Sequence, residues 1–202
     1  MEARKEARAQ SEKILRTVLG ETSYSLVVYV PNAGGRLDSF VMRYAKTVGM
    51  NVGFECALLP GCPNTSWQSK FSGPMLVDLL TNNGCVAAVQ GEDLVCFHPI
   101  GQETCDPGAR KWLSQDKANQ MVSMQMPPGS VPADEVLRKI ALKAHLTLDL
   151  PKPGTTKAVL FYIRGAVLAD VLDALARISK FEFNKTNIVY NGELVTSQTL
   201  RD

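Results

Sequence analysis

The chain contains the same pattern twice, and this internal repeat restricts the folds that it can adopt. The segment at 26–54 reads LVVYVPNAGGRLDSFVMRYAKTVGMNVGF, and the segment at 122–150 reads VSMQMPPGSVPADEVLRKIALKAHLTLDL. Aligned positions share one offset of 96 residues without a gap: Val30-Pro31 with Met126-Pro127, Asp38 with Asp134, Ala45 with Ala141, and Met50 with Leu146. Two copies of one structural unit are therefore predicted.

The composition is that of an ordinary soluble globular protein with one or two domains. The 202 residues are 45% hydrophobic and 21% charged with a formal net charge of +2, which indicates neither nucleic-acid binding nor membrane-surface binding. No apolar run approaches the roughly 18 residues that a membrane helix needs. The first residues, MEARKEARAQSEK, lack the apolar centre of a signal peptide. The N-terminus leaves two origins open, a cytosolic protein or an exported one whose signal has been removed.

The first copy is predicted to alternate strands and helices. A helix at 2–19 precedes it, with an apolar stripe that ends at Gly20. Apolar residues at helical spacing predict a second helix from Leu37 to Val48. The remaining elements follow from β-branched, aromatic and turn residues: strands at 25–30, 51–57 and 67–71, a short helix opened by Gly73-Pro74, and a hairpin of 85–89 with 94–97.

The second copy repeats this order after a linker that Trp112 is expected to anchor by packing. Gly73 aligns with Gly165 and Asp78 with Asp170, now at an offset of 92 because the intervening loop is shorter. The predicted elements are strands at 120–126, 146–150 and 157–163, helices at 133–144 and 168–178, and a hairpin of 181–183 with 187–190.

These elements predict an α+β fold of two tandem small βαββαββ modules preceded by an N-terminal helix. The predicted boundaries are an N-terminal helix at 1–22, a first module at 23–100, a linker at 101–119, a second module at 120–193 and a polar tail at 194–202.

Five cysteines lie in the first half of the chain, and none forms a C-x-x-C pair. Cys56 and Cys62 flank a Pro60-Gly61 turn, so a short-loop disulfide is sterically feasible. Cys85 and Cys96 lie on two runs joined at a turn, and one register of the hairpin places them opposite one another. Candidate disulfides therefore involve these four residues, with buried free thiols as the alternative. The odd count leaves Cys105 single or available to a neighbouring chain.

No catalytic, cofactor or metal site is indicated. The only histidines, His98 and His145, lie in different copies, and the cysteine spacing does not match common zinc sites. A P-loop, a nucleophile elbow and a G-x-G-x-x-G loop are all missing. Basic residues are balanced by acidic ones, and the G-x-x-G clamp of RNA-binding KH modules is missing. The sequence therefore predicts neither an enzyme nor a nucleic-acid-binding protein.

The element order resembles that of the secretin and TonB N-terminus short domain. The matching stretches of the first copy are Val30-Pro31, the helix at 37–45, Gly49-Met50-Asn51-Val52, Phe71-Ser72-Gly73 and Gly91-Glu92-Asp93-Leu94-Val95. Those of the second copy are Ile163-Arg164-Gly165, Leu168-Ala169-Asp170-Val171-Leu172 and Asn187-Ile188-Val189-Tyr190. The resemblance departs from the family at the cysteine-bearing 56–62 loop and at Ala144-His145-Leu146, where the glycine before the strand is missing.

The resemblance implies a structural subunit of an envelope-spanning secretion, pilus or conjugation machine. Such a protein is periplasmic, associated with the outer membrane, and assembled into a ring with protein partners. Candidate interface residues lie on the two strands expected at sheet edges: Ser25, Val27, Tyr29, Val122, Met124 and Met126. The alternatives are a signalling or adaptor module that binds one partner by strand addition, and a cytosolic enzyme or RNA binder.

Overall fold

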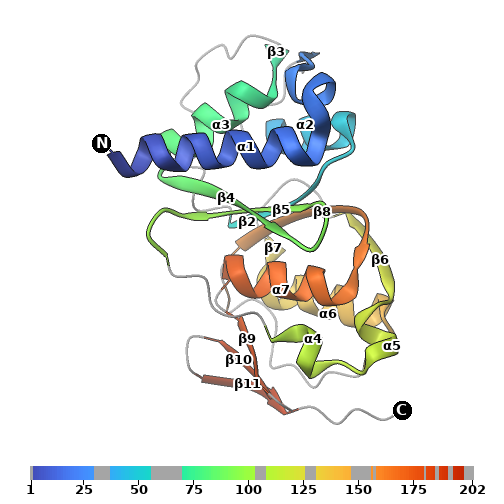
Figure 1. Cartoon of the computed structure of the whole chain (residues 1–202). Helices are drawn as coiled ribbons and strands as arrows, with labels where there is room; N and C mark the ends of the chain where they lie inside the picture. Colours follow the sequence, from blue (N-terminus) through green and yellow to red (C-terminus); the bar gives the residue numbers. More distant parts are fainter. Residues whose placement is uncertain are drawn as a thin grey trace.

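The computed structural model describes residues 2–29, 37–55, 70–102, 108–125, 131–146, 156, 158–179, 181–184, 187–190 and 193–197. The helices are α1 (Glu2–Ser25), α2 (Leu37–Val48), α3 (Gly73–Asn82), α4 (Ala109–Trp112), α5 (Gln115–Ala118), α6 (Ala133–Lys143) and α7 (Leu168–Ser179) (Figure 1). The strands are β1 (Val28–Tyr29), β2 (Asn51–Glu55), β3 (Lys70–Phe71), β4 (Cys85–Gln90), β5 (Leu94–Pro99), β6 (Met121–Gln125), β7 (Val131–Pro132), β8 (Ala158–Val167), β9 (Phe181–Asn184), β10 (Asn187–Tyr190) and β11 (Glu193–Ser197). The fold is mixed α+β with an N-terminal helix, as the sequence predicts.

A six-stranded mixed sheet lies at the centre, in the order β4-β5-β2-β8-β6, with β7 also paired to β8. β2 runs parallel to β5 and antiparallel to β8. A two-stranded ladder of β1 with β3 and a three-stranded sheet of β11, β10 and β9 lie apart from it. Because β2 belongs to the first copy and β8 to the second, strands from both sides of the predicted linker form one sheet.

Helices cover both faces of this sheet, with α1, α2 and α3 on one face and α6 and α7 on the other (Figure 1). Alternate residues of β5 enter different cores: Leu94 and Cys96 pack with α7, whereas Val95 and Phe97 pack with α1 to α3. A strand that is buried on both faces needs apolar side chains at successive positions. This requirement explains the apolar run from Leu94 to Phe97 in β5.

The first and third strands of the two copies pair in the same register. In the first copy Val28 lies opposite Phe71 and Tyr29 opposite Lys70. In the second copy Met124 lies opposite Ile163 and Gln125 opposite Tyr162. These partners are related by the offsets of 96 and 92 residues that the sequence alignment gives.

The first helix ends later than predicted, which shortens the following strand. Gly20 interrupts α1 with φ 71°, ψ 159°, but helical structure resumes and continues to Ser25. The Tyr44 hydroxyl donates to the carbonyl oxygens of Ser23 and Tyr24, each at 3.3 Å, and so holds this extra segment. The strand predicted to start at Ser25 therefore starts at Val28.

Two other predictions concern the end of the chain and the linker. Residues 194–197, predicted as polar tail, belong to β11, which pairs antiparallel with β10. Trp112 is buried as predicted, with its ring centroid 5.2 Å from that of Phe183. Residues 147–150 of the strand predicted at 146–150 and residues 67–69 of the strand predicted at 67–71 lie outside the described residues.

A buried carboxylate on α7 holds the linker helix in place. Asp173 is 5% exposed, and its Oδ1 accepts the backbone N–H of Ala109 at 2.8 Å, at the start of α4. Burial raises the pKa of Asp173 from 3.8 to about 6, while the Ala109 hydrogen bond opposes this shift. In the unfolded chain the carboxyl would lose its proton at lower pH.

The protein should therefore lose stability as the pH rises from about 4 to about 6, since the folded state holds the Asp173 proton more tightly than the unfolded state. The difference between 3.8 and about 6 corresponds to roughly 3 kcal/mol. Asp173→Asn keeps the acceptor for Ala109 and should remove this dependence, so that above pH 6 it is more stable than the wild type. Urea unfolding at pH 4, 5, 6 and 7 measures both proteins, and the same pH dependence in the two would contradict the expectation.

Candidate functional site

The β4 edge of the central sheet is covered by side chains of α1. The backbone N–H of Ala87 donates to the Ser11 hydroxyl at 2.9 Å, and the Gln10 side-chain amide donates to the Ala87 carbonyl oxygen at 3.2 Å. Ser11 is fully buried. The helix thus supplies hydrogen bonds that a neighbouring strand would otherwise provide, which is one way in which proteins protect a sheet edge.

The β6 edge is open in the part of the chain that the structure describes, where β6 pairs with β8 alone. Its side chains alternate, with the predicted interface residues Val122 and Met124 buried at 5% and 4% exposure and Met121 62% exposed. The register shifts between Val122 and Met124, and the hydroxyl of the intervening Ser123 donates to the Arg164 carbonyl oxygen. Among the described residues, the outer edge of β6 is therefore the unpaired side of this strand, whereas Val122 and Met124 belong to the core.

The second predicted interface strand is shorter than expected. Ser25 ends α1 instead of starting a strand, while Val27 and Tyr29 are 55% and 67% exposed. Tyr29 lies in the two-residue strand β1 opposite Lys70. Met126, at the end of the other predicted strand, lies outside the described residues.

The expected opposition of Cys85 and Cys96 is wrong, and both thiols are free. In the hairpin Cys85 lies opposite Pro99, and Cys96 lies opposite Ala88. Since Cys85 and Ala88 are three positions apart on one strand, the two cysteines face opposite sides of the sheet and enter different cores. Cys56, Cys62 and Cys105 lie outside the described residues.

A buried asparagine joins the two copies at the start of β2. The Asn51 amide nitrogen donates to Asp93 Oδ2 at 2.9 Å and to the Gly165 carbonyl oxygen at 3.1 Å. Its amide oxygen accepts the Arg164 backbone N–H at 2.8 Å. Asn51 is 2% exposed. One side chain therefore ties the β4–β5 turn of the first copy to β8 of the second.

An acidic pocket of about 350 Å³ opens beside this bridge, and its walls come from both copies. Its charged residues are Glu92, Asp93, Asp170 and Arg110. Arg110 Nη2 lies 3.3 Å from Asp170 Oδ1, so the pocket has more carboxylates than cations. Gly91 turns over it with φ 62°, and a Cβ atom there would collide with the Asp170 carboxylate. We name the pocket that these residues line the acidic pocket.

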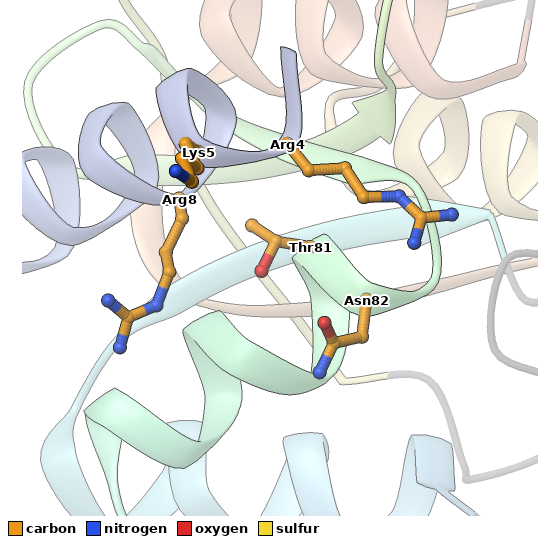
Figure 2. Close-up of a pocket in the computed structure, with 5 residues that line it drawn as sticks. All are labelled: Arg4, Lys5, Arg8, Thr81 and Asn82. Carbon is orange, nitrogen blue, oxygen red and sulfur yellow. The ribbon is translucent and has the colours of Figure 1, made fainter. Parts of the chain in front are cut away.

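A basic pocket of about 430 Å³ lies where α1 meets the end of α3. Figure 2 shows Arg4 and Arg8 extending from α1 on either side of Thr81, with Asn82 beside Arg4 and Lys5 above. Arg8 Nε donates to Asp78 Oδ1 on α3 at 2.6 Å, which fixes this guanidinium. Within the described residues, Arg4 and Lys5 form no ion pair. We name this the basic pocket.

The lining residues of the two pockets do not have the grouping that a metal centre needs. Among the described residues, His, Cys, Asp and Glu form no group of three that could hold a metal ion. His98 is buried, with Nδ1 3.0 Å from the Pro99 carbonyl oxygen, and burial lowers its pKa. In the same part of the chain, no helix is both long and apolar enough to cross a lipid bilayer.

Sequence reasoning misses both pockets and the Asn51 bridge. In the sequence Asn51 belongs only to a strand motif, although a polar residue at the start of an otherwise apolar strand is a usable signal. Asp170 is a repeated carboxylate for which helix position alone favours a surface role. Nothing in the sequence places Arg110 or Met121 near it, because that proximity arises from packing.

Comparisons with known proteins give no relative for this chain. No protein-family model, curated protein or solved structure matches it. The resemblance to the secretin and TonB short domain therefore stays a prediction.

Replacing Asn51 by alanine should lower the free energy of unfolding by about 1–3 kcal/mol. The substitution leaves the Gly165 carbonyl oxygen and the Arg164 backbone N–H without their hydrogen bonds to the Asn51 amide. Urea unfolding of Asn51→Ala measures this loss. Asn82→Ala, at an exposed position, should change stability by less than about 0.5 kcal/mol. Equal effects of the two substitutions would contradict the proposed bridge.

Cys85 and Cys96 should not react in the folded protein. Burial raises the pKa of Cys85 to about 11 and that of Cys96 to about 12, so the reactive thiolate is scarce near neutral pH. A variant in which Cys56, Cys62 and Cys105 are replaced by serine isolates these two thiols. Ellman's reagent should detect none under native conditions and both after unfolding in urea, and rapid native labelling would contradict the structure.

Proposed function

We propose that this chain is a structural subunit of an envelope-spanning secretion, pilus or conjugation machine, and that it assembles laterally into a ring through the β6 edge. The observation that carries the proposal is the contrast between the two sheet edges. α1 covers β4 with hydrogen bonds to Ala87, whereas β6 pairs with β8 alone among the described residues.

An open edge strand favours association with another strand. Its outward N–H and C=O groups form hydrogen bonds with an added strand, and neighbouring side chains supply specificity. Each contact of this kind is weak in isolation, but closing a ring adds the contacts together. The exposed side chains of Met121, Ser123 and Gln125 flank this edge and are accessible to a partner.

Strand pairing between the two copies within one chain is a precedent for strand pairing between chains. β2 of the first copy and β8 of the second pair antiparallel, from Val52 with Tyr162 to Glu55 with Val159. The common register of the β1–β3 and β6–β8 ladders supports the interpretation of the copies as related βαββαββ modules. On this proposal the chain joins its own modules by strand pairing and joins its neighbours in the same way. The periplasmic location next to the outer membrane rests on the family resemblance.

An adaptor that binds one partner protein by strand addition is the alternative. The short length of β6, five residues from Met121 to Gln125, suits a single added peptide strand. The two functions differ in stoichiometry, since a ring needs many identical contacts and an adaptor needs one. A one-to-one complex with a monomeric chain would favour the adaptor.

Two lysines on β6 should disrupt the assembly, because charged side chains on an edge oppose strand pairing. We expect the double variant Ser123→Lys with Gln125→Lys to weaken self-association by at least about tenfold, measured by sedimentation velocity. Val89→Lys combined with Leu142→Lys adds the same charge at exposed positions away from β6 and should associate normally. A wild-type protein that is monomeric over the whole concentration range, with no envelope partner recovered by crosslinking, would refute the ring.

A further inference from the structure

The two pockets carry opposite charge and lie at opposite ends of β4. The basic pocket includes Thr81 and Asn82, which precede β4, and the acidic pocket includes the turn at 91–93, which follows it. α1 runs along β4 between them, with its N-terminus at the far end from that turn (Figure 1). Six residues of strand span roughly 20 Å, so the cations of one pocket cannot reach the carboxylates of the other within one chain.

Two cations at the start of α1 form no ion pair within the described residues. Arg4, Lys5 and Arg8 occupy the first two turns of the helix together with Glu2 and Glu6, whose carboxylates suit the helix dipole at this end. Arg8 is paired with Asp78, but Arg4 and Lys5 are exposed and form no ion pair within the described residues. The side chains of Arg4 and Lys5 are therefore accessible to a carboxylate of another molecule.

In the acidic pocket, carboxylates outnumber cations. Asp93 accepts a hydrogen bond from Asn51, and Asp170 pairs with Arg110. Glu92 is exposed at the tip of the turn and forms no ion pair in the described part of the chain. A volume of about 350 Å³ can admit the end of an arginine or lysine side chain.

The acidic pocket is also continuous with the proposed assembly surface. Met121, the first residue of β6, is 62% exposed and lines this pocket. A neighbour that approaches the β6 edge therefore meets the acidic pocket as well. Charge complementarity and this continuity both indicate that the occupant is a second copy of the chain.

We propose that the first turns of α1 of one copy dock with Arg4 and Lys5 in the acidic pocket of the next copy, so that copies associate head to tail. The inference rests on the proposed self-assembly and adds its direction and its polar contact. A contact between two different surfaces repeats from copy to copy, and it closes into a ring when the rotation allows.

Charge reversal tests this contact. Arg4→Glu with Lys5→Glu, and separately Glu92→Lys, should each weaken self-association by at least about tenfold, because like charges then face one another. The glutamates suit the dipole at the start of α1, so loss of association cannot be ascribed to an unfolded helix. Lys13→Glu with Lys70→Glu changes the net charge by as much as the α1 double variant, at exposed positions outside both pockets, and should leave association unchanged.

Mixing the two reversed proteins provides the decisive measurement. The carboxylates introduced by Arg4→Glu and Lys5→Glu then meet the ammonium group introduced by Glu92→Lys, and sedimentation velocity should show association restored to within about threefold of the wild type. Normal association of the reversed proteins, together with loss in the β6 lysine variant, would overturn this contact while leaving the β6 edge. A wild-type protein that never self-associates would overturn both.

Discussion

The antiparallel pairing of β2 with β8 is the contact on which the rest of the structure depends. It joins strands from the two copies into one sheet and gives β5, β2 and β8 two buried faces. α7 of the second copy then packs against β5 of the first, and α1 to α3 cover the other side. Asn51 secures this junction, because its amide bonds to the β4–β5 turn and to β8 at once. The acidic pocket exists because the same junction brings the turn and α7 together.

The contrast between the covered β4 edge and the open β6 edge connects this architecture to the proposed function. Gln10 and Ser11 occupy the polar groups of Ala87 on β4, so growth of the sheet in that direction is blocked. At the other end of the strand order, β6 lies at an edge that is bounded by the acidic pocket. In the proposed assembly, the start of α1 of one copy meets the acidic pocket beside β6 of the next, so that each copy presents one surface and receives another. Two cations on α1 without an ion pair among the described residues are consistent with that polarity.

The sequence predicted the elements well where apolar periodicity is strong. The helices at 37–48 and 168–179 and the hairpin of β4 with β5 follow their predicted positions closely. It failed where tertiary contacts override local signals: Tyr44 keeps residues up to Ser25 helical, and β11 forms from a polar segment by pairing with β10. For the candidate functional site, the sequence predicted the two edge strands and neither pocket. Alternation identified Val122 and Met124 on one face but could not tell that this face is the core.

By itself, the sequence determined where the strongly periodic helices lie, and that the segments at 26–54 and 122–150 share one pattern. The offsets of 96 and 92 relate Val28 and Phe71 to Met124 and Ile163, and the two ladders share this register. Only the tertiary structure decided how the copies join, which edge stays open and where the charged residues gather. Side-chain patterns specify which faces of a strand are buried, whereas strand neighbours are chosen through backbone hydrogen bonds that every residue except proline can form.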